Sequence, residues 1–188
     1  LLYPVLHNLP TEVKELNITM GSPLKSTPMF SFVKEIFHMQ ISAQRYNRNV
    51  FYYKDVIALI EHPYFLKFAN TKEIQNFKSL ITKQNIVFIT QDNIRNIFIN
   101  DFTSDLFTTW KGHNDAINIL NKLIEYFKIH LVGNSATVES EVLTTFFRTI
   151  IILQKLLNKY NFVLELKTLK VIMEQLVSKE IIPFQGEP

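Results

Sequence analysis

The chain has only four glycines among its 188 residues, and this scarcity limits the folds that it can adopt. Sharp turns and left-handed backbone corners usually need glycine, so sandwiches and barrels built from many short strands are disfavoured. Apolar residues recur instead at i, i+3, i+4 and i+7, the spacing that lines one face of a helix. This spacing predicts helices from about Asn114, over Val138–Tyr160 and from Leu169 to Leu176. Within the second of these, Ile150–Leu153 is apolar all round, which predicts that this helix is the buried centre of a mainly α fold.

Local signals add shorter elements to this fold. Thr27 followed by Pro28 is typical of a helix start, with a hydroxyl N-cap and proline at the first helical position. Thr71 opens another apolar period, and a short helix over Lys54–Glu61 is expected to stop near His62-Pro63. The strand candidates are brief and rich in β-branched or aromatic residues: Leu16–Thr19, Val50–Tyr53 and Ile86–Ile89.

Composition narrows the class of protein. The absence of cysteine excludes disulfides, thiolate metal sites and cysteine nucleophiles, and it fits a reducing compartment. No apolar run approaches the roughly 18 residues of a membrane span, and no signal peptide pattern opens the chain. We therefore expect a cytoplasmic protein without a membrane partner. The net charge of +3 permits contact with nucleic acid but is too small to demonstrate it.

Residue patterns that carry catalysis or bind metals are missing. The stretch Asn17–Thr27 ends like a phosphate-binding loop, but Leu24 stands where the second glycine is needed and Pro23 removes a backbone donor. It is predicted instead to be a strand, a Gly-Ser-Pro turn and a helix start. No two histidines share the i, i+4 spacing of a helical metal site. Two acid-x-lysine pairs occur, Glu12 with Lys14 and Glu165 with Lys167. This number of pairs is no greater than a random placement of acidic residues and lysines would give. We predict no catalytic residue, no metal ligand and no cofactor in this chain.

Aromatic residues make up 13% of the chain, and most of the phenylalanines lie on the predicted apolar helix faces, where core packing explains them. Tyr46, Tyr52 and Tyr53 are the least core-like rings, and Arg45 and Arg48 lie beside them in sequence. Rings next to cations are what single-stranded nucleic acid uses for stacking and phosphate contact. A nucleic-acid contact is therefore predicted at Arg45, Tyr46, Arg48 and Tyr53, and also at Lys25.

Four segments in this order resemble a known family. They are "LLYPVLHNLP", "NITMGSPLKSTP", "FYYKDVIALIEHPYF" and "IPFQGEP". The resemblance is to the helicase-like proteins related to AddB and RecC, which belong to the PD-(D/E)XK nuclease family. At the position of Ser22, the family usually has a tyrosine, so this chain departs from the family pattern there. The positions of this chain that fall on the family motifs are Thr19, Gly21, Pro23, His62, Pro63, Gly186 and Glu187.

The resemblance implies a particular domain organisation. Residues 1–28 would form the edge of a second RecA-like domain at the fourth helicase motif, and 29–180 a helical insertion, the 2B-like subdomain of superfamily 1 helicases. Residues 181–188 would return toward the fifth motif. Both ends then look cut, and we expect a piece of a longer protein. Mg²⁺ and ATP would be used by other parts of that protein, and DNA, the remaining domains and a second helicase subunit would be its partners.

Three functions remain open at this stage. The first is a non-catalytic helical part of a DNA-repair helicase-nuclease that guides DNA or braces the nuclease domain. The second is a helical protein-interaction scaffold that never contacts DNA. The third is a self-contained enzyme, which the lack of catalytic motifs makes the weakest.

Overall fold

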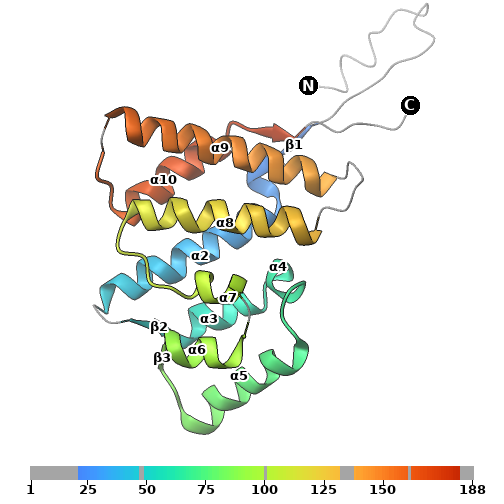
Figure 1. The fold of residues 1–188 in the computed structure, drawn as a ribbon, viewed down its shortest axis with the longest axis vertical. Helices are drawn as coiled ribbons and strands as arrows, with labels where there is room; N and C mark the ends of the chain where they lie inside the picture. The colour runs from blue at the N-terminus through green and yellow to red at the C-terminus, as the bar shows by residue number, and fades with distance from the viewer. Residues whose placement is uncertain (1–20, 47–48, 100, 132–137, 161, 183–188) are drawn as a thin grey trace, which may run out of the picture.

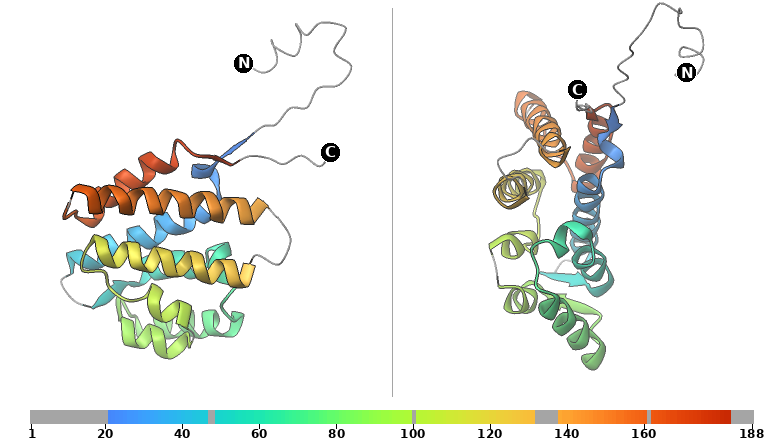
Figure 2. Two further views of the ribbon diagram at one scale, coloured as in Figure 1. Left: turned by 45° about the horizontal axis from the view of Figure 1, so that its top comes forward. Right: turned by 90° about the vertical axis from the view of Figure 1, so that its right-hand side faces the viewer.

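The computed structural model describes residues 21–46, 49–99, 101–131, 138–160 and 162–182. This part of the chain is 75% helical, which confirms the predicted mainly α class. The helices form two layers that pack face to face (Figure 1 and Figure 2). One layer contains α9 (Val138–Tyr160), α8 (His113–Leu131), α7 (Asp101–Leu106) and α6 (Gln91–Ile97). The other contains α10 (Leu166–Val177), α2 (Pro28–Arg45), α3 (Tyr53–Ile60) and α5 (Thr71–Gln84), with the short α4 (Pro63–Leu66) beside α2 and α3.

The predicted helix starts are confirmed in detail. Thr27 Oγ1 accepts a hydrogen bond from the Phe30 N–H at 3.3 Å, and Pro28 occupies the first helical position of α2. Helix α5 begins at Thr71 behind a capping box formed by Asn70 and Glu73. Helix α3 stops before His62-Pro63, as expected, although Pro63 also starts α4. The periodicity and capping signals therefore place the longer helices within a few residues.

The prediction that the helix over 138–160 is the buried centre is wrong. Ile152 on α9 is 43% exposed, because α9 is the outermost helix of its layer and leaves one side to solvent (Figure 2). Helix α2 is the real centre, and it contacts α3, α4, α10 and the strand β2 (Val50–Tyr52). Its buried residues surround most of the helix: Met29, Phe30, Phe32, Val33, Ile36, Phe37, Met39, Gln40 and Ala43. An apolar run on a long helix therefore did not identify the central element.

Phenylalanine rings fill the space between the two layers, as the sequence predicts. Phe32 of α2 lies 6.0 Å from Phe127 of α8, centroid to centroid, and Phe65 of α4 lies 6.1 Å from Phe102 of α7. Among the described residues, nine phenylalanines are at most 1% exposed: Phe32, Phe37, Phe51, Phe65, Phe77, Phe98, Phe107, Phe127 and Phe146. Each such side chain contributes about 1.5–3 kcal/mol of transfer free energy. Most of these rings are therefore committed to folding.

Two small antiparallel ribbons complete the described part of the chain. Strand β2 pairs with β3 (Phe88–Thr90), close to both predicted strands. Strand β1 (Ser22–Pro23) pairs with β4 (Ile181–Ile182), so the Gly-Ser-Pro segment is extended and not the predicted turn. Glycine is required here, because a Cβ at Gly21 would lie 2.0 Å from Ile181 Cγ2. The short helix η1 (Leu24–Ser26) then leads into α2, and the predicted strand Leu16–Thr19 lies outside the described residues.

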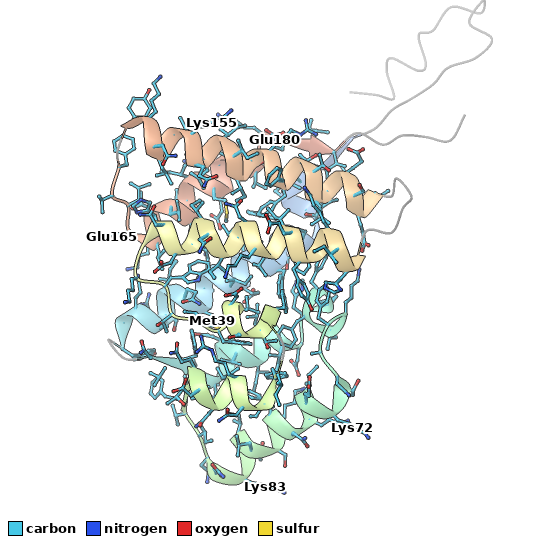
Figure 3. The ribbon with its side chains drawn as sticks, viewed as in Figure 1. Met39, Lys72, Lys83, Lys155, Glu165 and Glu180 are labelled. Atoms are coloured by element: carbon cyan, nitrogen blue, oxygen red, sulfur yellow. The ribbon has the colours of Figure 1, made fainter. Side chains whose placement is uncertain are left out.

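Charged side chains lie at the periphery. Figure 3 shows Met39 near the middle of the molecule and Lys72, Lys83 and Lys155 at its edges. In the described ranges, no helix combines the length and the apolar character needed to cross a bilayer. The proposed domain boundaries at 28 and 181 stay predictions. The segments on either side of the helical part nevertheless meet in the β1–β4 ribbon, and Leu24 is fully buried against the helical core.

Candidate nucleic-acid interface

The β2–β3 ribbon exposes aromatic side chains on one face and buries apolar ones on the other. Phe51 pairs with Ile89 in the register, and both side chains point into the core. The next pair, Tyr52 with Phe88, faces the opposite way because side chains alternate along a strand. Phe88 is 43% exposed. The ribbon therefore holds a tyrosine and a phenylalanine side by side at the surface on a rigid backbone.

Two further rings extend this pair into a continuous surface. The ring centroid of Tyr46, at the end of α2, lies 4.5 Å from that of Phe88, and Tyr46 is 39% exposed. The Tyr52 centroid lies 5.9 Å from Phe88 and 5.1 Å from Tyr53, at the start of α3. We call Tyr46, Tyr52, Tyr53 and Phe88 the aromatic face. Tyr46 caps the end of α2 and the other three rings belong to β2, β3 and α3, so the fold brings together rings from separate parts of the chain.

Cations flank the aromatic face. Arg45 is exposed in the last turn of α2, where its charge also complements the negative end of the helix dipole. Lys54 Nζ lies 6.0 Å from the Tyr53 ring centroid. The nearest acid in sequence, Asp55, is turned away: its carboxylate lies 3.5 Å from His38 Nδ1 and its side chain is only 9% exposed. Arg48, also predicted to contact nucleic acid, lies outside the described residues.

Lys25 is at the other end of α2. It is exposed on η1, next to the β1–β4 ribbon, whereas Arg45 is the last residue of α2, 20 positions later. At 1.5 Å per residue, the 18 residues of α2 that lie between the two ends span about 27 Å. The structure therefore links Tyr46 to Tyr53 through Phe88 and Tyr52, with Arg45 next to Tyr46 in the chain, and leaves Lys25 at the other end of α2.

The segments that carry the family resemblance meet at the Lys25 end. Gly21 and Pro23 lie on or beside β1, while His62 lies between α3 and α4 and Pro63 is the first residue of α4. A pocket of about 360 Å³ joins them, lined by Thr27, Pro28, Pro63, Tyr64, Val142 and Ile182 among others. Thr19, Gly186 and Glu187 lie outside the described residues. The three motif segments thus converge in space although they are far apart in sequence.

His62 has a structural role at this end. Its Nδ1 accepts a hydrogen bond from the Tyr64 N–H at 3.2 Å and so caps α4, and its Nε2 lies 3.1 Å from Ser31 Oγ. A ring that accepts at Nδ1 carries its proton on Nε2, so it donates to the Ser31 hydroxyl. Burial lowers the pKa of His62 below its ordinary value, and the negative charge of Glu35 opposes that shift. The neutral imidazole is therefore the form that the fold uses.

The charged groups of this pocket are paired with each other. Lys67 Nζ lies 2.5 Å from Glu139 Oε1 and 5.1 Å from the Tyr64 ring centroid. Burial and the Glu139 charge raise the pKa of Tyr64 to about 12, so its phenol stays protonated. In the ranges that the structure describes, no three His, Asp or Glu side chains gather as a metal site would require. The aromatic face is therefore the stronger candidate for function.

Sequence reasoning missed one member of the aromatic face. Phe88 was placed in a predicted strand but was not distinguished from the core phenylalanines. Side chains alternate along a strand, so the sequence alone indicates that Phe88 and Ile89 face opposite ways. Which of the two faces solvent can be decided only when the partner strand and its register are known. Comparison with known proteins finds no family model, no curated protein and no solved structure that matches this chain. The family resemblance of the motif segments therefore stays a prediction.

Proposed function

We propose that this chain is a non-catalytic helical module that holds single-stranded DNA on the aromatic face. The observation that supports the proposal is the continuous run from Tyr46 through Phe88 and Tyr52 to Tyr53, with Arg45 and Lys54 beside it. Bases stack on exposed aromatic rings for about 1–3 kcal/mol each, whatever their sequence. The cations add phosphate contacts that position the strand without reading it.

The arrangement suits guidance of a strand because its parts are fixed before binding. Three of the four rings are on regular elements, and the ribbon backbone is held by Phe51 and Ile89 in the core. Pre-ordered rings lose little conformational entropy when a base stacks on them. In a protein of the AddB and RecC type, such a module would guide DNA or brace a nuclease domain, while Mg²⁺ and ATP would be bound elsewhere in the protein.

The proposal is tested by titrating the 188-residue chain with fluorescently labelled single-stranded, forked and duplex DNA at about 50 mM and about 200 mM salt. We expect single-stranded and forked DNA to bind more tightly than duplex, with affinity falling as salt rises. Tyr46→Ala and Phe88→Ala should each weaken binding by roughly tenfold, in line with the stacking free energy. Arg45→Gln should weaken binding and reduce its salt dependence.

Tyr160→Ala is the matched control, because Tyr160 is 53% exposed at the end of α9, on a different part of the surface. It should leave DNA binding unchanged. Since Tyr46 and Phe88 are both substantially exposed, their alanine variants should keep the unfolding midpoint close to that of the parent chain. Equal losses for Tyr160→Ala and Phe88→Ala would refute the assignment of binding to the aromatic face.

A protein-interaction scaffold is the second candidate, and a specific surface favours it. Ile152, Leu156 and Tyr160 follow one another at i, i+4 spacing on α9, and all three are exposed. Phe162 and Val163 continue this apolar strip. Exposed apolar strips of this kind are typical of surfaces that dock another protein. If no form of DNA binds even at low salt, the scaffold function replaces the DNA-guiding one.

A further inference from the structure

A polar pocket of about 420 Å³ opens beside the aromatic face, at the end of α2. Its volume is within the range of small-molecule sites, about 300–1,000 Å³. Its lining comes from α2, from the residue before β2 and from the connection between α7 and α8: Gln40, Gln44, Asn49, Thr109, Trp110 and Lys111. The pocket and the aromatic face share the last turn of α2, since Ala43 and Gln44 line the pocket and Tyr46 caps the same helix.

Some of the amide groups at the rim of the pocket are available for hydrogen bonds to a ligand. Gln44 Nε2 donates to the Trp110 carbonyl at 3.4 Å, and Thr109 Oγ1 donates to Asn49 Oδ1 at 3.0 Å. Among the described residues, no hydrogen bond engages Gln44 Oε1 or Asn49 Nδ2. One acceptor and one set of donors therefore remain at the rim, supplied by two different amides.

The charged residue that lines the pocket is a cation. Lys111 is exposed at its edge, and the lining contains no acidic residue. The nearest acid in the sequence, Asp115, accepts a hydrogen bond from the Lys111 backbone N–H at 2.8 Å and lies outside the lining. The free amide groups of Gln44 and Asn49 offer one acceptor and two donors, and Lys111 adds a cation. A group with both donors and acceptors on one edge, attached to a phosphate, fits this lining.

We propose that the polar pocket binds one unstacked nucleobase of a single strand, with Gln44 and Asn49 on the base edge and Lys111 toward its phosphate. Amide side chains pair with base edges through one donor and one acceptor, and adenine offers the best match to such a pair. Single-stranded nucleic acids expose these edges, whereas a duplex hides them. The inference rests on the proposed function and adds a place where a base, and not only a stacked ring, is recognised.

The only tryptophan of the chain, Trp110, lines the pocket and reports on it. The experiment titrates the full chain with dAMP, dGMP, dCMP and dTMP and follows tryptophan fluorescence, excited at the red edge where nucleobases absorb little. We expect saturable quenching by all four, with dAMP binding most tightly. Absence of quenching by every nucleotide overturns the inference, as does quenching by maltose in place of nucleotides.

Two variants tie the signal to the rim. Gln44→Leu and Asn49→Leu should each weaken dAMP binding by about fivefold to tenfold, because a base edge is left unpaired. Gln75→Leu is the matched control, since Gln75 is an exposed amide on α5. Unchanged dAMP affinity in both rim variants would overturn the assignment of the base to these amides. All variants are first checked for the parental unfolding midpoint.

The outcome separates this inference from the proposed function. If oligonucleotides bind and Phe88→Ala weakens them, while mononucleotides give no quenching, the aromatic face stands and the base pocket is refuted. If mononucleotides quench but single-stranded DNA does not bind, the strand-holding function is refuted and the pocket remains as a site for free nucleotides. If both signals appear and Gln44→Leu reduces both, the two sites act on the same strand.

Discussion

Gln40 is the residue whose replacement tests the packing of the fold most directly. It is fully buried in the middle of α2, yet its side chain is polar. Its Nε2 donates to the carbonyl oxygens of Leu106 at 3.3 Å and Thr108 at 2.8 Å, and its Oε1 accepts the Trp110 N–H at 3.0 Å. One amide therefore satisfies three backbone groups, one at the end of α7 and two in the α7–α8 connection, and ties the two layers together.

The cost of Gln40→Leu follows from those three contacts. A buried polar group that loses its hydrogen-bond partner lowers the free energy of unfolding by about 1–3 kcal/mol. The largest loss is expected from the Trp110 N–H, because this group is buried. The Leu106 contact is long and Thr108 O is only partly buried, so each of these adds about 1 kcal/mol. The leucine regains about 1 kcal/mol by apolar transfer. We expect a net loss of about 3 kcal/mol, a large part of the roughly 5–15 kcal/mol that stabilises a domain.

Urea denaturation followed by circular dichroism measures this loss. Gln75→Leu, which replaces an exposed amide on α5, is the control and should change the free energy of unfolding by less than about 0.5 kcal/mol. Gln40→Glu adds a second check, because a carboxylate accepts the Trp110 N–H but cannot donate to the two carbonyls. Burial raises the pKa of such a carboxyl, so this variant should regain stability as the pH falls. A loss below about 1 kcal/mol for Gln40→Leu would refute the reasoning.

Three further predictions concern the Lys25 end of the molecule. Thr27→Ala removes the N-cap of α2 and should lower the free energy of unfolding by about 1 kcal/mol in urea, whereas Thr27→Ser should restore most of it. Gly21→Ala places a methyl group against Ile181 Cγ2 and should cost about 1–3 kcal/mol, and the added change Ile181→Ala should recover part of that loss; equal instability of single and double variants would count against the clash. His62 has a lowered pKa, so the folded state prefers the neutral ring, and the stability that it contributes is complete above the ordinary value of 6.5 and is lost as the pH falls below it. His62→Asn keeps the cap without titrating, and urea midpoints measured against pH should show a shallower acid decline for it than for the parent chain.

The longer helices could be predicted from sequence because each one repeats its apolar period several times. Helices α6 and α7 were not predicted, since 7 and 6 residues give fewer than two full turns and too few repeats to recognise. The identity of the central helix was also out of reach. Periodicity describes one face of an element, whereas centrality depends on how many neighbours surround it, and α2 gained its neighbours from the tertiary arrangement.

Part of the candidate site could be predicted from the sequence, because some of its residues are close together in the chain. Tyr46, Tyr52 and Tyr53 cluster in sequence, so their grouping needed only local reasoning. Phe88 joins them through the register of β2 with β3, a pairing between residues 36 positions apart that no local signal specifies. The polar pocket could not be predicted from the sequence, because Gln44 and Thr109 come together only when the α7–α8 connection packs on α2.

The position of α2 sets how the two ends of the molecule could share one DNA strand. The aromatic face and Arg45 lie at its end, whereas Lys25 lies before its start, and α2 itself is about 27 Å long. A stacked strand advances about 3.4 Å per nucleotide, so it must span about eight nucleotides to touch both cations. Under the proposed function, we expect a shorter strand to contact the aromatic face alone, with one base at the polar pocket. The proposal therefore predicts that strand length, and not base sequence, determines whether Lys25 contacts DNA.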